Sequence, residues 1–219
     1  MPRSPILLTF ANNVNLKIKR QMKQQVLFVL LNEYADWEGA FLASALNAGV
    51  MPGSNTNYVC KVVAPTMDAV ISIGGFRTLP DYTFQTLPDD YAALVLIGGM
   101  QWNSPEAEQV EPVVRKALEN GKIVGAICNA ASFMAAHGFL NDVKHTGNTL
   151  EQLKLWGKDN YKNEKGYVER QAVSDKHIVT ANGSGYMEFC REMLQLLQAD
   201  TEENIAASYQ FNKFGLYKE

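Results

Sequence analysis

Cysteine and histidine are both scarce in this sequence, which contains three of each in 219 residues. The cysteines, Cys60, Cys128 and Cys190, are widely spaced and form no C-x-x-C pair. This spacing excludes a disulfide framework and a zinc-binding cysteine cluster, and it favours a reducing compartment. We therefore expect a cytoplasmic protein without a bound metal, and no motif predicts a cofactor.

Long apolar runs and clusters of basic residues are also missing. The apolar patch at residues 6–10 is too short to span a bilayer and is followed by asparagines in place of a small-residue cleavage site, so we expect no signal peptide. The formal net charge is −3, and the only basic cluster covers residues 17–20. Nothing here predicts binding to nucleic acid or to a membrane.

The composition is that of a folded globular protein, with 47% hydrophobic and 20% charged residues. A chain of this length can form one α/β domain with a substantial core. We expect that domain at residues 22–199, with a peripheral segment at 1–21 and a C-terminal arm or helix at 200–219.

Short apolar runs alternate with helical periodicity along the chain. Strands are predicted at 26–31, 58–64, 91–97, 121–127, 167–173 and 177–181, and helices after Glu38, at 104–119, after Cys128 and at 186–197. Residues 70–80 are predicted to form a small hairpin or excursion, and residues 82–87 a loop. Because buried strands alternate with helices and short Gly-marked connections, we predict an α/β fold with a doubly wound parallel sheet.

Cys128 follows a predicted strand directly and precedes small residues that suit a helix. At such a turn the next helix offers unpaired N–H groups and the positive end of its dipole, and both stabilise a thiolate. The arrangement is the cysteine counterpart of a nucleophile elbow. We predict that Cys128 is the reactive residue; the alternative is a buried structural cysteine.

Other polar or glycine-rich segments follow predicted strands in the same way. They are Glu38, Gly98 with Gly99, and residues 182–185. In a doubly wound sheet the carboxyl ends of the strands form the binding edge, so these segments are expected to meet Cys128 there. Taken alone, the glycine pair is more typical of a tight turn, and a lone glutamate in a first helical turn more often interacts only with the helix dipole.

A cysteine nucleophile usually needs a base, normally histidine. His137 lies about 13 Å along the predicted helix from Cys128, too far to act, and His177 begins a predicted strand. His145 is the remaining candidate for proton transfer. Trp37 and Trp102 lie in predicted edge loops, where they mark a binding surface or pack locally.

The chain resembles the ThiJ/PfpI family of the class I glutamine amidotransferase-like superfamily, on the segments 34–38, 96–99, 126–130 and 180–185. Segments 72–76 and 79–82 resemble a bacterial subgroup described as amidotransferase-like or as proteases. The resemblance implies a flavodoxin-like three-layer α/β/α sandwich and a homodimer. It further implies Cys128 as nucleophile, Glu38 as its carboxylic partner, and Gly99 and Asn129 as oxyanion donors. The expected pocket around them contains Gly98, Trp102, Asn148, Asn182 and Gly183.

The sequence also departs from that family pattern. Peptidase members have a histidine directly after the nucleophile, where this chain has Asn129, and carbonyl-processing members have a histidine near the position of Asn148. We therefore expect a cysteine-dependent hydrolase, amidase-like or carbonyl-processing enzyme acting on a small molecule. The alternatives are an oxidative-stress sensor, a chaperone-like dimer, and an intracellular peptidase, the last disfavoured by Asn129.

Overall fold

The computed structural model describes residues 23–216, so the predicted peripheral segment lies outside the described residues. The strands of the main sheet are β1 (Gln24–Val29), β2 (Tyr58–Ala64), β5 (Tyr82–Thr83), β6 (Ala93–Leu96), β7 (Ile123–Ile127), β8 (Ala172–Asp175) and β9 (Ile178–Ala181). The helices are α2 (Asp36–Ala48), α3 (Glu111–Glu119), α4 (Asn129–Ala136), α5 (Leu150–Gly157), α6 (Tyr186–Leu196) and α7 (Glu202–Phe214). Short 3₁₀ turns lie at Ala107–Val110, Lys158–Asn160 and Glu164–Gly166.

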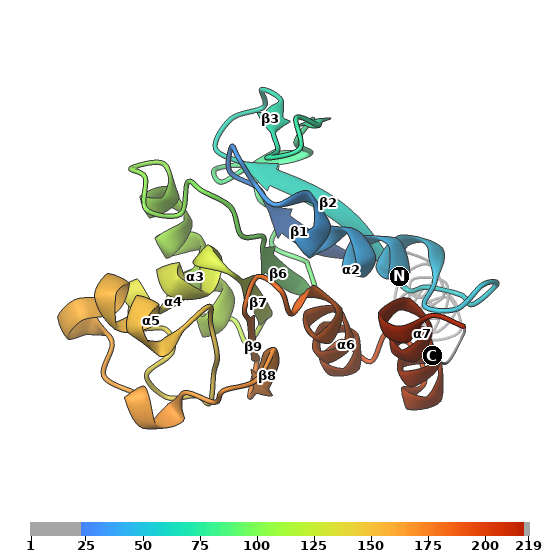
Figure 1. Cartoon of the computed structure of the whole chain (residues 1–219). Coiled ribbons are helices and arrows are strands. Elements are labelled where there is room, and N and C mark those ends of the chain that lie inside the picture. Colours follow the sequence, from blue (N-terminus) through green and yellow to red (C-terminus); the bar gives the residue numbers. More distant parts are fainter. Residues whose placement is uncertain (1–22, 217–219) are drawn as a thin grey trace, which may run out of the picture.

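The seven strands form one twisted sheet in the order β5-β2-β1-β6-β7-β9-β8 (Figure 1). All neighbouring pairs are parallel except β8 and β9. In the centre, Leu94 of β6 pairs with Leu27 of β1 and with Val124 of β7, and all three side chains are fully buried. The predicted doubly wound parallel sheet is therefore confirmed.

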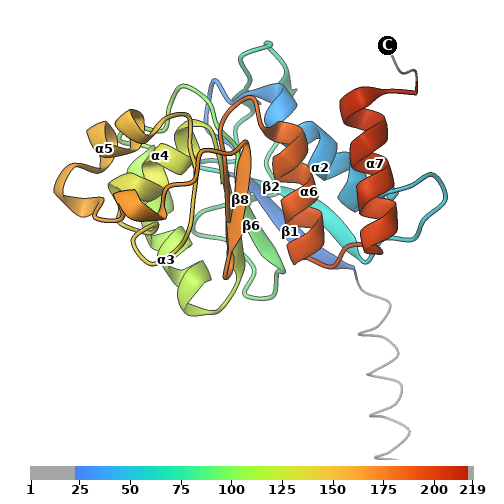
Figure 2. The same ribbon diagram turned by 60° about the horizontal axis from the view of Figure 1, so that its bottom comes forward.

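Helices cover both faces of this sheet and make three layers (Figures 1 and 2). On one face, α3 and α4 pack on a core that includes Phe133 and Met134. On the other face, α2 and α6 pack on a core that includes Leu42 and Phe189. Strands buried on both faces explain why their sequences read as continuous apolar runs.

The segments between the strands differ in detail from the sequence prediction. The predicted helix 104–119 is a 3₁₀ turn followed by α3. The α-helix begins next to Pro112, because proline is tolerated in the first turn of a helix, where its missing N–H has no partner to lose. Residues 70–80 form the expected excursion, with β3 (Val70–Ile71) antiparallel to β4 (Arg77–Thr78). Residues 82–83, predicted as loop, extend the sheet as β5.

The C-terminal hairpin is shorter than predicted. Strand β8 begins at Ala172, not at Tyr167, and a two-residue turn that includes Lys176 at φ 52° joins it to β9. The exposed residues 169–171 lie outside the strand. The apolar pattern alone could not distinguish these polar residues, which precede the strand, from the strand itself.

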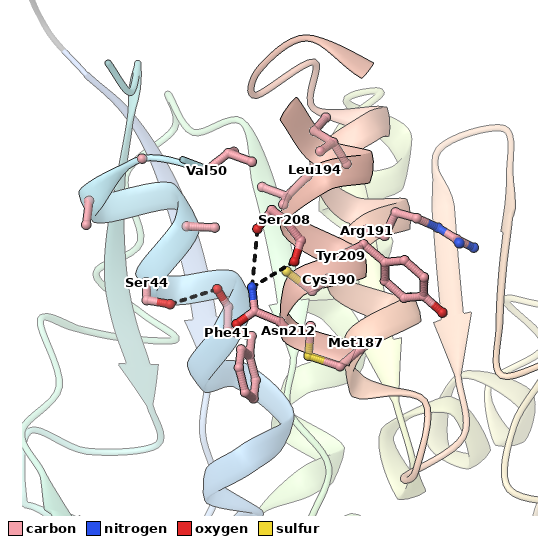
Figure 3. A pocket seen from close by; sticks show the side chains of 14 residues that line it. Phe41, Ser44, Val50, Met187, Cys190, Arg191, Leu194, Ser208, Tyr209 and Asn212 are labelled. Carbon is pink, nitrogen blue, oxygen red and sulfur yellow. Dashed lines mark hydrogen bonds between the residues drawn. The ribbon is translucent and has the colours of Figure 1, made fainter. Parts of the chain in front are cut away.

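Helix α7 forms the predicted C-terminal helix and packs beside α6. It closes a small pocket of about 160 Å³ between α2, α6 and α7, in which Cys190 lies (Figure 3). Tyr209 of α7 donates a hydrogen bond to the buried Glu188 of α6 at 2.7 Å, and Lys213 pairs with the same carboxylate. No helix of the described residues is long and apolar enough to cross a membrane.

Gly125 of β7 allows α6 to pack closely against the sheet. A Cβ at this position would lie 2.7 Å from Met193 Sδ and 2.9 Å from Phe189 Cζ. We expect Gly125→Ala to lower the free energy of unfolding by about 1–3 kcal/mol, measured by urea denaturation, since overpacking forces side chains from their preferred rotamers. Combining it with Met193→Ala should cost less than the sum of the two single changes; strict additivity would contradict this contact.

Candidate active site

Cys128 occupies the turn between β7 and α4. Its backbone has φ 61° and ψ −127°, a conformation that L residues rarely adopt. Hydrogen bonds hold the turn from both sides: the Cys128 amide donates to the Ala181 carbonyl at 2.9 Å, and the Cys128 carbonyl accepts from the Ala131 amide at 3.0 Å. This is the geometry of a nucleophile elbow at the carboxyl edge of the sheet.

Two glycines allow the neighbouring chain segments to approach Cys128. A Cβ on Gly98 would lie 2.3 Å from Glu38 Oε2 and 2.6 Å from Cys128 Cβ. A Cβ on Gly183 would lie 3.0 Å from Cys128 Sγ and 3.3 Å from Glu38 Oε1. The structure thus brings Glu38, Gly98 and Gly183 together around the sulfur.

Glu38 lies in the first turn of α2 and is only 2% exposed. Burial raises the pKa of its carboxyl from 4.5 to about 7, and interactions with the Cys128 thiol and the Gly98 backbone oppose this rise only in part. Within residues 23–216, its buried Oε2 atom has no hydrogen-bond partner. The carboxyl can therefore gain or lose a proton near neutral pH.

The pKa of the Cys128 thiol is raised, whereas the stabilised thiolate expected from the sequence would have a lowered pKa. Burial, followed by the charge of Glu38, raises its pKa to about 11. The side-chain amide of Asn148 and the backbone amide of Asn129 lower the pKa, as the helix-terminus argument predicts, but they do not outweigh the loss of solvation. At neutral pH the sulfur is held as a thiol beside a carboxyl that is half ionised.

The side-chain amide of Asn148 also contacts the sulfur of Cys128. Its Nδ2 lies 3.5 Å from Cys128 Sγ, and its Oδ1 accepts the Gly183 amide at 2.9 Å. Because the Gly183 amide can only donate, it fixes Oδ1 on its own side and turns the NH₂ group toward Cys128.

A second amide group links Asn129 to the loop after β6. Asn129 Nδ2 donates to the Gly99 carbonyl at 2.8 Å, and its Oδ1 accepts from Gln152 Nε2 at 2.7 Å. The Gly99 amide donates to no acceptor in the part of the chain that the structure describes. Sequence reasoning missed Gln152; the only signal was its place in the first turn of the helix that follows Asn148.

His145 and Trp102 occupy positions different from those expected. His145 is fully buried, with Nδ1 2.8 Å from the Val143 carbonyl and Nε2 2.7 Å from the Tyr161 hydroxyl, and burial lowers its pKa. With both ring nitrogens occupied, it has no free nitrogen for Cys128. Trp102 is 2% exposed and donates its indole N–H to the Ile97 carbonyl at 2.7 Å, so it belongs to the core and not to a binding surface.

A groove of about 770 Å³ opens beside this cluster. Asn148 and Asn182, both expected in the pocket, line it, together with residues 149–151, Tyr167 and residues 169–171. Gly98 and Gly183, also expected in the pocket, lie beside Cys128 and Glu38. An open polar groove therefore lies next to the cluster around Cys128.

The fold and the site together define a flavodoxin-like α/β protein with a cysteine at a strand–helix elbow. The chain belongs to the DJ-1/PfpI family, whose model matches residues 24–196.

Individual relatives agree with this assignment. The Bacillus subtilis protein named Uncharacterized protease YdeA is 39% identical over 195 residues, which are 89% of this chain and 93% of that relative. The crystal structure of a thiJ/pfpI family protein from Bacillus anthracis matches with a TM-score of 0.81 and 32% identity, over 89% of this chain and 92% of that chain. A DJ-1 superfamily protein from Agrobacterium tumefaciens matches with a TM-score of 0.77 and 33% identity, over 87% and 98% of the two chains.

The opposing effects of Glu38 and Asn148 on the thiol can be measured directly. We expect Glu38→Gln to lower the pKa of Cys128, since a negative charge is removed, and Asn148→Ala to raise it, since a donor to the sulfur is lost. The measurement is the pH dependence of iodoacetamide alkylation at Cys128, followed by mass spectrometry. His145→Gln should leave the profile unchanged, and shifts of the same sign in the first two variants would contradict the assignment.

Proposed function

We propose that this protein is a cysteine-dependent enzyme that acts on the carbonyl carbon of a small amide or reactive aldehyde, with Glu38 as the base. The observation that carries the proposal is a buried carboxyl, its pKa raised to about 7, beside a thiol on a strained elbow. A base with a pKa near the working pH is the most effective proton acceptor. It supplies the role for which the sequence offered no suitable histidine.

In the proposed step, Cys128 Sγ attacks the carbonyl carbon while the thiol proton passes to the Glu38 carboxylate. The C–S bond forms, and the electron pair of the carbonyl π bond moves to the oxygen. The amides of Gly99 and Asn129 are the proposed donors to this oxyanion. Because the thiol pKa is about 11, the attack requires proton transfer to Glu38 and does not start from a preformed thiolate.

The second half of the reaction returns the proton. With an aldehyde that carries an adjacent ketone, protonated Glu38 gives its proton to the new alkoxide, which yields a hemithioacetal. The C1 hydrogen of this adduct then moves as a proton to the ketone carbon, which gives a thioester of a 2-hydroxy acid. With an amide, protonated Glu38 protonates the departing nitrogen, which also leaves a thioester. In both cases water hydrolyses the thioester and frees the thiol. Asn148 holds the sulfur in place throughout.

Two Bacillus subtilis relatives carry the word protease in their names. A peptidase resembling the family's peptidase members would need a histidine where this chain has Asn129. The side chain of Asn129 is bonded to Gly99 and Gln152, which supports a part in shaping the oxyanion site. We therefore propose a small substrate in preference to a protein.

The nucleophile proposal predicts that Cys128→Ser and Cys128→Ala abolish turnover of small amides or reactive aldehydes. Glu38→Gln should lower kcat by about 10²–10⁴-fold, the usual contribution of a positioned base. Turnover is measured by substrate loss, with Cys60→Ser as the matched control that should keep full activity. Activity that survives both changes at Cys128 would rule out the nucleophile.

A second function is favoured by the unpartnered Oε2 atom of Glu38. When this carboxyl is protonated, it can donate a hydrogen bond to an oxygen on an oxidised Cys128, which would favour a sulfinate and an oxidation-sensing role. Hydrogen peroxide is the oxidant, and each step adds one oxygen to sulfur and releases water.

The oxidation proposal predicts selective modification. Under graded peroxide, Cys128 should gain two oxygens before Cys60 or Cys190, because burial raises the pKa of each of those thiols to about 12 without any nearby donor that lowers it. Mass spectrometry of the three peptides measures the order. Glu38→Ala should reduce the yield of sulfinate, and equal modification of all three cysteines would remove the basis for sensing.

A further inference from the structure

The groove beside Cys128 carries charges that the proposed chemistry does not use. It lies between the N-terminal end of α5 and residues 167–171, and its volume of about 770 Å³ is in the range of ligand pockets. Asn148 connects it to the proposed nucleophile, because this side chain lines the groove and also contacts Cys128 Sγ at 3.5 Å.

Among the described residues, Arg170 is the only cationic side chain that lines this groove. Its backbone is fixed, since its amide donates to the Val168 carbonyl at 2.8 Å and its carbonyl accepts from Thr146 Oγ1 at 2.9 Å. Within residues 23–216, its guanidinium forms no ion pair. An arginine held by its backbone but free of an internal carboxylate is suited to bind an anion in bidentate geometry.

Two amide side chains lie next to Arg170 along the groove. Asn182 Oδ1 accepts from the Ser184 amide at 3.1 Å, and the single hydroxyl proton of Ser184 is within reach of Asn182 Oδ1 at 2.9 Å and of Gln171 Oε1 at 3.2 Å. Neither Asn182 nor Gln171 donates a side-chain hydrogen bond within the described residues, so both keep an NH₂ group available. Arg170, Gln171 and Asn182 therefore supply three donor groups to one groove.

Two carboxylates also line the groove. Glu151 and Glu169 form no ion pair with Arg170 within the described residues. They disfavour a ligand with several negative charges. The combination suits a molecule whose single carboxylate reaches the arginine.

We infer that Arg170, with Gln171 and Asn182, recognises a carboxylate on the substrate, so that the enzyme acts on monocarboxylates that bear an amide or aldehyde group. This inference rests on the proposed function, because it places the electrophilic carbon at Cys128 while the carboxylate lies in the groove. It makes Arg170 a specificity-determining residue.

A pair of thiol reagents that differ in charge tests the inference without a known substrate. Iodoacetate carries a carboxylate and iodoacetamide is its neutral counterpart, and both react with the same thiolate. The ratio of their rates at Cys128 at one pH is therefore independent of the thiol pKa. We expect Arg170→Gln to lower the iodoacetate-to-iodoacetamide ratio by about threefold to tenfold, as one lost charge contact would.

Two control variants separate recognition from net charge. Lys116→Gln removes an exposed positive charge of α3 that lies outside this groove and pairs with Asp89, and it should leave the ratio unchanged. Glu169→Gln should raise the ratio. An unchanged ratio in Arg170→Gln, or an equal fall in Lys116→Gln, would overturn the inference. Failure of Cys128 to react with iodoacetamide in the wild type would instead count against the nucleophile itself.

Discussion

The site depends on the strained backbone of Cys128. A residue with a side chain at φ 61° and ψ −127° costs on the order of 1–3 kcal/mol, so the surrounding structure must hold it there. The hydrogen bond to Ala181 in β9 does so from one side and the first turn of α4 from the other. Gly98 and Gly183 then leave the space in which the buried Glu38 meets the sulfur. The central sheet therefore fixes the geometry, and the chemistry of the side chains follows from it.

Most of the fold could be predicted because buried parallel strands have a clear sequence signature. Strand β2 begins and ends at the predicted residues, since the run from Tyr58 to Ala64 is bounded by Asn57 and Pro65. The prediction of strands was wrong where tertiary contacts, and not the local sequence pattern, decide whether a segment joins the sheet. Thr83 pairs with β2 only because the chain passes that edge, and residues 167–171 approach the sheet without joining it.

The site could be predicted in part. Cys128, Glu38, Gly98 and Gly183 share a signal, since each follows a predicted strand, and the sheet brings them together. The position of His145 could not be predicted, because sequence pattern does not reveal that Tyr161 and the Val143 carbonyl would occupy both imidazole nitrogens. Trp102 packs locally, which was one of its two expected roles. The raised pKa of the thiol could not be predicted either, since it depends on burial and on the charge of Glu38, which is distant in the sequence. Gln152 became visible only through its contact with Asn129.

The buried position of Glu38 also affects the folding equilibrium. An unfolded chain would release the proton of this carboxyl near pH 4.5, whereas the native protein keeps it until about pH 7. Between these values the chain takes up a proton as it folds, so this group's contribution to stability is full below pH 4.5 and is lost as the pH rises through 7. The loss is on the order of 3 kcal/mol, at about 1.4 kcal/mol for each pH unit. The protein thus gives up part of its folding free energy at neutral pH to keep an ionised carboxylate beside a cysteine.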